Sequence, residues 1–283
     1  MRKARMLVTG GSGFLGSLLC RRGVEQGYEV WGTYVSNRPP EIEGVHPLRL
    51  DLQDDRAILE AVEISAPEVV IHTAYKKNDD QVMCRGTSRL AESCGNLERP
   101  PFFIFISTDF VFDGKKGHYT EQDTPGPVLE YGRQKLEGEI AVRKFLPEAL
   151  VVRTSLLYDL DRIPAHLDFV FAALEKNGKC SIFQDEFRSP VVVGELAEAL
   201  LKLAGMRYSG LLHIAGADRV DRYWLGLEML RLFGFSTAGV SAGALDGSGI
   251  IRPPDTSLDS SRAEKLLGMR FSGAKEVLRE VKI

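Results

Sequence analysis

The chain has 283 residues, of which 44% are hydrophobic and 27% charged, as in an ordinary globular protein with one large domain or a domain and a lobe. Its formal net charge of -3 argues against a nucleic-acid partner, because such a surface needs an excess of basic residues. No apolar run approaches the roughly 20 residues that span a bilayer, and no apolar segment follows the basic start. We therefore expect a cytoplasmic protein without a membrane partner.

The cysteines and histidines do not indicate a metal site. No pair among the 4 cysteines has the spacing of a metal or redox motif, so we expect reduced, packed thiols. The 5 histidines are scattered, and His72 and His213 lie inside apolar strand-like runs, where we expect structural roles. No carboxylate cluster requires Mg²⁺, which is possible but not indicated.

In the first half of the chain, nearly continuous apolar runs alternate with helical patterns. The apolar runs are typical of parallel strands covered on both faces and comprise residues 5–9, 28–34, 68–73, 102–107 and 149–153. Residues 46–50 form a further strand-like run. Helical patterns cover residues 13–26, 54–65, 79–95 and 129–145, with Asp54 as a good N-cap. The alternation predicts an α/β fold with a doubly wound parallel sheet of the Rossmann type.

The second half of the chain is less regular. We expect a strand at 210–215, helices at 193–204, 221–233 and 258–267, and loops at 117–127 and 239–254. The pattern predicts a Rossmann domain at residues 1–158, completed by about 190–217, and a smaller C-terminal lobe of residues 159–189 and 218–283. We expect the lobe at the carboxyl edge of the sheet, where ligands bind in open α/β sheets.

A glycine-rich turn follows the first predicted strand, with the sequence Gly10-Gly11-Ser12-Gly13-Phe14-Leu15-Gly16. Gly10 allows a tight turn, Gly13 allows close approach of a pyrophosphate, and Gly16 lets the helix pack on the strand. The helix N-terminus adds a partial positive charge. The turn predicts a dinucleotide site, and its G-x-x-G-x-x-G spacing resembles that of the short-chain dehydrogenase/reductase superfamily.

The residues after the second predicted strand bear on the choice of cofactor. An NAD site usually has an acidic residue there for the ribose 2′-hydroxyl, but residues 32–38 contain none. Ser36 and Arg38 could instead hold a 2′-phosphate, because a guanidinium pairs with phosphate bidentately. Arg38 could also be a solvated loop residue. We expect NADP(H) to be preferred over NAD(H).

Tyr131 and Lys135 are four residues apart at the start of a predicted helix, so they share a face. A free phenol has a pKa of about 10, and a nearby ammonium group lowers that pKa by favouring the phenolate. Such a phenol can protonate a carbonyl oxygen while a nicotinamide gives hydride to the carbon. Ser107 and Thr108, at the end of the strand 102–107, are candidates for the hydroxyl that orients the oxygen. A surface pair on the helix is the alternative interpretation.

Longer segments resemble the dTDP-4-dehydrorhamnose reductases, which belong to the extended short-chain dehydrogenase/reductases. The run Ser107-Thr108-Asp109-Phe110-Val111-Phe112-Asp113-Gly114 is similar to the family's S-T-D-Y-V-F-D-G segment, and residues 119–139 resemble its Tyr-Gly-x-x-Lys-Leu-x-Gly-Glu region. Similarity continues at 152–155, 187–190, 210–213 and 252–259, so it spans the chain. The resemblance implies an NADPH-dependent reductase of a nucleotide-linked 4-keto sugar, with Tyr131 as proton donor, and a possible homodimer.

Together with the motifs above, the resemblance implies the site residues. The catalytic residues would be Thr108, Tyr131 and Lys135. The cofactor would contact Gly10, Ser12, Gly13, Phe14, Leu15, Gly16, Ser36, Arg38, Asp51, Leu52, Thr73, Ala74, Tyr75, Ser107, Tyr131, Lys135 and Arg153. The substrate would contact Asp109, Phe110, Val111, Phe112, Leu156, Arg188 and Arg252. The Rossmann domain would then bind NADP, and the lobe would bind the nucleotide sugar.

Three positions depart from the family pattern. Leu156 replaces a tryptophan that often lies against the sugar, and Phe110 replaces a tyrosine, which weakens the case for the rhamnose-pathway substrate. Met83 replaces an asparagine common in extended members, which leaves the proton relay open. The alternatives are a sugar-nucleotide epimerase and a non-catalytic, NADP-binding subunit similar to the methionine adenosyltransferase β subunit. A 4,6-dehydratase is disfavoured, because Phe110 occupies the position of its acid.

Overall fold

The computed structural model describes residues 2–36, 38, 41–76 and 81–280, with only the backbone at 81–83. The described chain forms two compact units. Unit 1 is drawn from Met1–Thr108, Arg133–Arg153 and Ala197–Leu212, and unit 2 from Asp109–Gly132, Thr154–Leu196 and His213–Ile283. The domain boundaries expected from the sequence stay a prediction.

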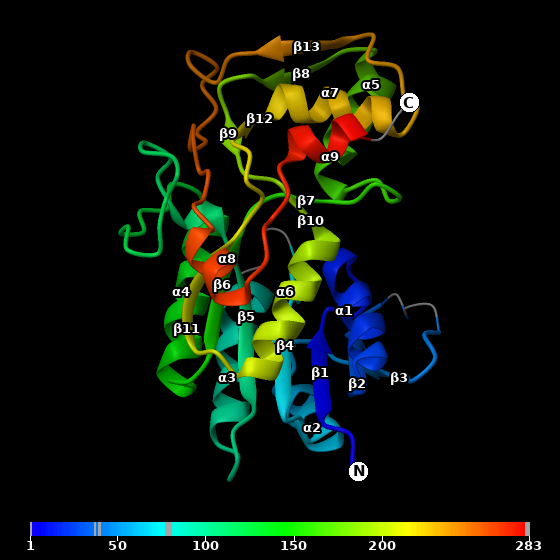
Figure 1. Cartoon of the computed structure of the whole chain (residues 1–283), viewed down its shortest axis with the longest axis vertical. Helices are drawn as coiled ribbons and strands as arrows, with labels where there is room; N and C mark the ends of the chain where they lie inside the picture. The colour runs from blue at the N-terminus through cyan, green and yellow to red at the C-terminus, as the bar shows by residue number, and fades with distance from the viewer. Residues whose placement is uncertain (1, 37, 39–40, 77–80, 281–283) are drawn as a thin grey trace. The chain divides into compact units, whose positions relative to one another are not determined.

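A seven-stranded parallel sheet confirms the predicted doubly wound α/β fold (Figure 1). Its order is β11-β6-β5-β4-β1-β2-β3, so the chain turns back at β1 and fills the sheet in both directions. The carboxyl ends of β1 and β4 flank this switch point, where open α/β sheets bind ligands. The strands are β1 (Arg5–Thr9), β2 (Glu29–Tyr34), β3 (Val45–Arg49), β4 (Val69–His72), β5 (Phe102–Thr108), β6 (Leu150–Thr154) and β11 (Gly210–Ile214).

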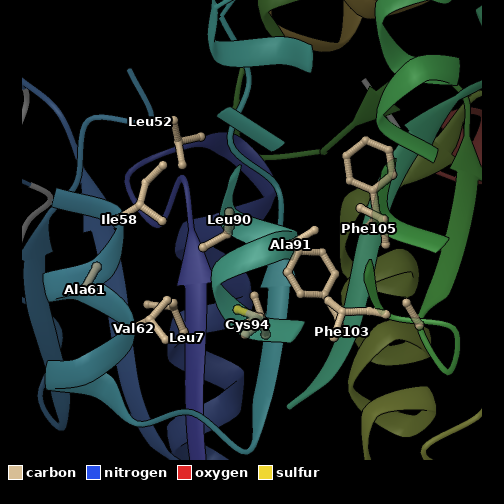
Figure 2. Close-up of a cluster of buried hydrophobic side chains, with 14 of the residues drawn as sticks. Leu7, Leu52, Ile58, Ala61, Val62, Leu90, Ala91, Cys94, Phe103 and Phe105 are labelled. Atoms are coloured by element: carbon tan, nitrogen blue, oxygen red, sulfur yellow. The ribbon is translucent and has the colours of Figure 1, made fainter. Parts of the chain in front are cut away.

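Helices cover both faces of the sheet, which explains why its strands are apolar throughout. Figure 2 shows one face, where Leu7 and Phe103 of the sheet pack with Ile58 and Leu90. Met6, the neighbour of Leu7, points to the opposite face, where its sulfur lies near Gly23. The helices around the sheet are α1 (Phe14–Glu25), α2 (Asp55–Ser65), α3 (Thr87–Gly95), α4 (Glu130–Phe145) and α6 (Val193–Met206).

The start of α2 agrees with the prediction from the sequence, whereas the start of α3 does not. The carboxylate of Asp54 accepts hydrogen bonds from the backbone N–H groups of Arg56 and Ala57, at 2.9 and 3.3 Å, so the predicted N-cap is confirmed. The predicted helix at 79–95 is wrong in its first part, because Gln81–Gly86 forms a wider π-helical turn. Residues 79–80 lie outside the described residues. Apolar spacing does not reveal a change from i→i+4 to i→i+5 hydrogen bonding.

Unit 2 contains short strands and helices around its own hydrophobic core. Tyr158, Ile182 and Met229 are buried at its centre. Its strands are β7 (Leu157–Tyr158), β8 (Cys180–Phe183), β9 (Phe187–Arg188), β10 (Val191–Val192), β12 (Val220–Asp221) and β13 (Val240–Gly243). Its helices are α5 (Asp168–Asn177), α7 (Arg222–Leu232), α8 (Ser261–Leu267) and α9 (Ala274–Glu280), with the 3₁₀ turns η2 (Asp109–Val111) and η3 (Ala165–Leu167).

Two expectations for the second half of the chain are wrong. The predicted loop at 239–254 contains β13, which pairs in parallel with β8 about 60 residues earlier. The predicted helix at 258–267 begins only at Ser261, because the backbone around Leu258 bonds to Tyr119: the Tyr119 N–H donates to Ser257 and the Asp259 N–H donates to Tyr119, both at 2.8 Å. Pairing between distant segments takes precedence over local helical spacing in both places.

The described residues contain neither a membrane-crossing helix nor a metal cluster. None of their helices combines the length and the apolar content that a bilayer crossing requires. Within the same ranges, no group of three or more His, Cys, Asp or Glu side chains is arranged to hold a metal ion. All the cysteines are free thiols; Cys20, Cys94 and Cys180 are buried, as expected, but Cys84 is partly exposed.

Candidate functional site

The turn between β1 and α1 forms a tight cradle that only glycine permits. Gly10 has a φ of +69°, and a Cβ atom on Gly16 would lie 2.1 Å from the carbonyl oxygen of Gly10. Gly13 caps α1 without a side-chain hydrogen bond, and the first turn of the helix has no acidic residue. Neither the cap nor the first turn of α1 thus carries a side chain that offsets the positive end of the helix dipole, so this cradle fits a pyrophosphate. Within it, Ser12 is exposed, Phe14 is half-buried and Leu15 is buried.

A cavity of about 510 Å³ lies beside this turn in unit 1. Gly11 and Gly32 line its floor, and Arg38 lines it together with Glu41 and Glu43. Arg38 and Gly11 of the glycine turn thus line the same cavity, and a contact of Arg38 with a 2′-phosphate stays a prediction. Ser36 is exposed and does not line this cavity.

Asp51 and Leu52 are both expected at the adenine, but the side chains of these two residues have different surroundings. The Asp51 carboxylate accepts the backbone N–H of Gln53 at 3.0 Å. The Leu52 side chain is buried in the core beneath α2 (Figure 2). Only the backbone of Leu52 therefore remains for a ligand contact, and the role of both residues stays a prediction.

The loop after β4 is fastened to the glycine turn. The Thr73 hydroxyl donates to the backbone oxygen of Thr9 at 2.7 Å, and the Ala74 N–H donates to the Thr9 hydroxyl at 3.3 Å. A Cβ on Gly10 would lie 2.9 Å from the Cα of Ala74, so the two loops are in close contact. Tyr75 is 53% exposed at the end of this segment.

His72 is a buried structural link beneath these loops. Its Nδ1 lies 2.6 Å from the Thr9 hydroxyl, and its Nε2 lies 2.9 Å from the Thr87 hydroxyl. Burial, aided by the charge of Lys135, lowers the pKa of His72 to about 3. The ring is therefore neutral at physiological pH and ties β1, β4 and α3 together.

Lys135 is buried against the end of β5. Its Nζ donates to the backbone oxygen of Ile106 at 2.9 Å and lies 4.9 Å from the ring centre of Phe105. Burial lowers the pKa of Lys135 to about 8, and the charge of Glu139 opposes that decrease. The anchor point is two residues before Thr108, the last residue of β5, whose side chain is buried.

A buried carboxylate next to Lys135 was not expected from the sequence. Glu139 accepts the Ser107 hydroxyl at 2.5 Å and two hydrogen bonds from Arg153, at 2.9 and 2.7 Å. Ser107 and Arg153, both expected at the cofactor, are thus bonded to this carboxylate. The sequence spacing could have indicated that Glu139 lies near Lys135, because Glu139 is four residues after Lys135 and shares its helical face.

Tyr131 lies in the first turn of α4, four residues before Lys135. Its half-buried ring meets the ring of Phe110 edge-on, with centroids 6.1 Å apart and an interplanar angle of 84°. A Cβ on Gly132 would lie 2.0 Å from the Phe110 carbonyl oxygen, so glycine is required where α4 begins. The short turn η2 thereby fixes the start of the helix that carries Tyr131.

Asp109 and Arg188, both expected at the substrate, are paired with each other inside unit 2. The Arg188 Nε donates to Asp109 at 2.6 Å, a second guanidinium nitrogen donates to the other oxygen, and the Ser155 hydroxyl adds a bond at 2.6 Å. The Arg188 guanidinium also lies 3.9 Å from the ring centre of Phe110. A direct substrate contact by either residue therefore stays a prediction.

A second carboxylate, Glu186, pairs with Arg252 in the same unit. The Arg252 Nε and its second terminal nitrogen lie 2.9 and 3.1 Å from the two Glu186 oxygens. Arg222 is also buried, but it forms no ion pair with any carboxylate of the described residues. Burial lowers the pKa of Arg222 to about 10. Among these five groups, three guanidinium cations stand against two carboxylates, and no local sequence pattern revealed this excess of positive charge.

The other residues expected at the substrate occupy different environments. Val111 and Phe112 are fully buried, and the Phe112 ring stacks on Tyr119 at 4.1 Å. Leu156 is half-buried against the core of unit 2. The side chain of Met83 lies outside the described residues.

Comparison with known proteins identifies relatives that match almost the whole chain. The family described as the RmlD substrate binding domain matches residues 4–282. The probable low-salt glycan biosynthesis reductase Agl14 of Haloferax volcanii is 32% identical, over 92% of this chain and 91% of its own. The methionine adenosyltransferase 2 subunit beta of Danio rerio is 25% identical, over 98% of this chain and 89% of its own.

A solved structure shares the fold over nearly the whole length. The dTDP-4-dehydrorhamnose reductase of Bacillus anthracis in complex with NADP has a TM-score of 0.79 and 21% identity, with coverage of 99% of this chain and 98% of that chain. The resemblance inferred from the sequence is thus confirmed. The chain belongs to the RmlD substrate binding domain family, within the extended short-chain dehydrogenase/reductase superfamily.

Proposed function

We propose that the protein is an NADPH-dependent reductase of a nucleotide-linked 4-keto sugar. The observation that carries the proposal is the arrangement of α4 and β5: Lys135 is anchored to Ile106, two residues before Thr108, and Tyr131 precedes Lys135 by one helical turn. A positioned phenol is a suitable general acid for a carbonyl oxygen. The 32% identity to a probable reductase supports the same reading.

In this reaction, different residues of the chain would bind the cofactor and transfer the proton. The cradle at Gly10 and Gly16 would hold the pyrophosphate, and Arg38 would hold the 2′-phosphate. When bound, the nicotinamide supplies a hydride to the carbonyl carbon and is oxidised. Tyr131 gives its phenolic proton to the carbonyl oxygen, so that C=O becomes CH–OH, and the phenolate regains a proton from water. Lys135 favours the phenolate by its charge.

The charge balance of unit 2 supports a substrate with an anionic diphosphate. Arg222 is a buried cation that forms no ion pair with a carboxylate of the described residues, and an anion in contact with it would offset the cost of that burial. The Nε2 of His166, whose pKa is lowered mainly by burial and then by Arg222 and Arg188, is buried without a hydrogen-bond partner. We propose that Arg222 faces the diphosphate and that His166 Nε2 accepts a ligand hydroxyl.

The sugar is expected to differ from that of the rhamnose pathway. Leu156 stands where an aromatic ring would stack on the sugar, a loss on the order of 1 kcal/mol or more. Phe110 lacks the hydroxyl of the family's tyrosine, and its ring is in contact with Arg188 and Tyr131 instead. We therefore expect dTDP-4-dehydrorhamnose to be a poor substrate compared with another nucleotide 4-keto sugar.

The test is NADPH oxidation with a panel of nucleotide 4-keto sugars. Tyr131→Phe should lower kcat by roughly 10²–10⁴-fold, because it removes the proton donor, while NADPH affinity stays nearly unchanged. Tyr28→Phe, a loss of one hydroxyl before β2, is the matched control and should keep full activity. Efficient turnover of dTDP-4-dehydrorhamnose would show that the inferred change of sugar is wrong.

A non-catalytic, NADP-binding subunit is the second candidate. The near-complete match to the methionine adenosyltransferase 2 subunit beta favours it, since fold and cofactor residues alone do not require turnover. If the wild-type protein binds NADPH tightly but reduces no member of the panel, this second function replaces the first. An epimerase would instead interconvert nucleotide sugars without net oxidation of NADPH.

A further inference from the structure

Glu139 connects three elements that meet at the end of β5. It lies one turn after Lys135 on α4 and is 2% exposed. Its carboxylate binds the Ser107 hydroxyl on β5 and the Arg153 guanidinium on β6. Ser107 follows Ile106, the residue whose carbonyl oxygen anchors Lys135. The Glu139 carboxylate therefore links α4 to the end of β5, which carries Thr108, and to β6.

The charges around this carboxylate do not cancel. Lys135 and Arg153 are buried cations, and Glu139 is the anion that faces both of them. Among the described residues, His72 on β4 also faces Lys135, and it is neutral because burial lowers its pKa to about 3. From β5, Lys135 meets the backbone carbonyl of Ile106 and the uncharged ring of Phe105. Glu139 is thus the counter-charge for two ions.

We propose that Glu139 is a positioning residue, whose carboxylate keeps Lys135 charged and holds the Ser107 hydroxyl at the end of β5 that carries Thr108. This rests on the proposed function for its use in catalysis, but not for the local charge balance. A Lys135 without a proton would lose its attraction for a phenolate on Tyr131. With Glu139 present, the pKa of Lys135 is only about 8, so a further decrease would discharge it at neutral pH.

The test measures the protonation of Lys135 directly. In protein labelled with ¹³C at lysine Cε, the Lys135 signal is identified by its loss in Lys135→Arg and is followed by NMR as the pH is raised. Glu139→Gln should lower the midpoint of Lys135 by about one pH unit or more, a tenfold shift, because the buried anion is removed. Glu137→Gln makes the same change on the exposed face of α4 and should leave the midpoint where it is.

Two further variants keep the test decisive if Glu139→Gln does not fold. Glu139→Asp retains the charge and should keep a midpoint close to that of the wild type. Arg153→Met removes the other cation that pairs with Glu139. The Glu139 carboxylate then stabilises only the charge of Lys135, and the titration midpoint of Lys135 should rise. An unchanged midpoint in Glu139→Gln, or in Arg153→Met when only that variant folds, would overturn the proposal.

The outcome is separable from the proposed reductase activity. If the midpoint moves as expected but no keto sugar is reduced, the reductase function fails and the role of Glu139 stands. If keto sugars are reduced and the midpoint does not move, Glu139 is only a structural residue. In an active protein, Glu139→Gln should shift the alkaline limb of the kcat profile by the same amount as the NMR midpoint.

Discussion

Arg188 and Asp109 form a two-pronged ion pair inside unit 2, although they are 79 residues apart in the chain. Their side chains are 3% and 0% exposed, and Ser155 donates a third hydrogen bond to the same carboxylate. Arg222 is also buried in this unit but has no such partner among the described residues. The two arginines should therefore respond differently to the loss of charge.

Arg188→Met should destabilise the protein by about 3–5 kcal/mol, because it removes the guanidinium that pairs with the buried Asp109 carboxylate. Arg222→Met removes a cation without stranding an anion, so the free energy of unfolding should stay the same or increase. Urea unfolding of both variants gives the comparison. An equal loss of stability in the two would contradict the charge balance described here.

Gly16→Ala should disturb the cofactor cradle, since the new methyl group would lie 2.1 Å from the Gly10 oxygen. We expect a loss of about 1–3 kcal/mol of stability from overpacking, together with a large loss of NADPH affinity. Gly205→Ala is the control: nothing lies within 4 Å of its Cβ position, and it sits near the end of α6. That variant should gain about 0.5–1 kcal/mol in thermal or urea unfolding and bind NADPH normally.

Arg38→Ala should weaken NADPH binding by roughly 10–100-fold, the effect of losing a hydrogen bond between charged groups. NADH affinity should hardly change, because NADH has no 2′-phosphate. Fluorescence titration with both nucleotides measures this, and Arg21→Ala on the exposed side of α1 is the control. Equal affinity for NADPH and NADH in the wild type would show that the predicted preference is wrong.

Acid should destabilise the protein through its buried histidines. Burial lowers the pKa of His72 to about 3, and that of His166 likewise, whereas the unfolded chain has a value of about 6.5. Between these values the unfolded state binds more protons, so stability is full above pH 6.5 and falls as the pH drops towards 3.

The slope of this dependence identifies His72. Each histidine that gains a proton on unfolding lowers the free energy of unfolding by roughly 1.4 kcal/mol per pH unit as the pH falls. Between pH 4 and 6 the wild type should lose up to twice this amount per unit, from two histidines. His72→Gln should lose about 1.4 kcal/mol per unit less than the wild type. Urea unfolding at several pH values measures both slopes. Identical slopes would mean that His72 is not the buried neutral group described here.

The sequence by itself determined the parallel sheet and the glycine turn. The strands β1, β4 and β5 are buried on both faces, and this leaves a continuous apolar run that is readable without any partner. The turn is readable because its steric demands fall on consecutive positions: Gly16 faces a carbonyl only six residues away. The shared helical face of Lys135 and Tyr131 was predictable for the same reason, because the two residues are one helical turn apart in the sequence.

Only the tertiary structure decided how the charged groups are paired. Arg188, expected at a substrate, faces Asp109, and Arg153, expected at a cofactor, faces Glu139. The pairing of β13 with β8 likewise joins segments about 60 residues apart. These choices depend on which distant groups burial brings within hydrogen-bond range, and in a buried site each unpaired charge is costly. Local spacing holds no information about such partners, because the fold has to form before they meet.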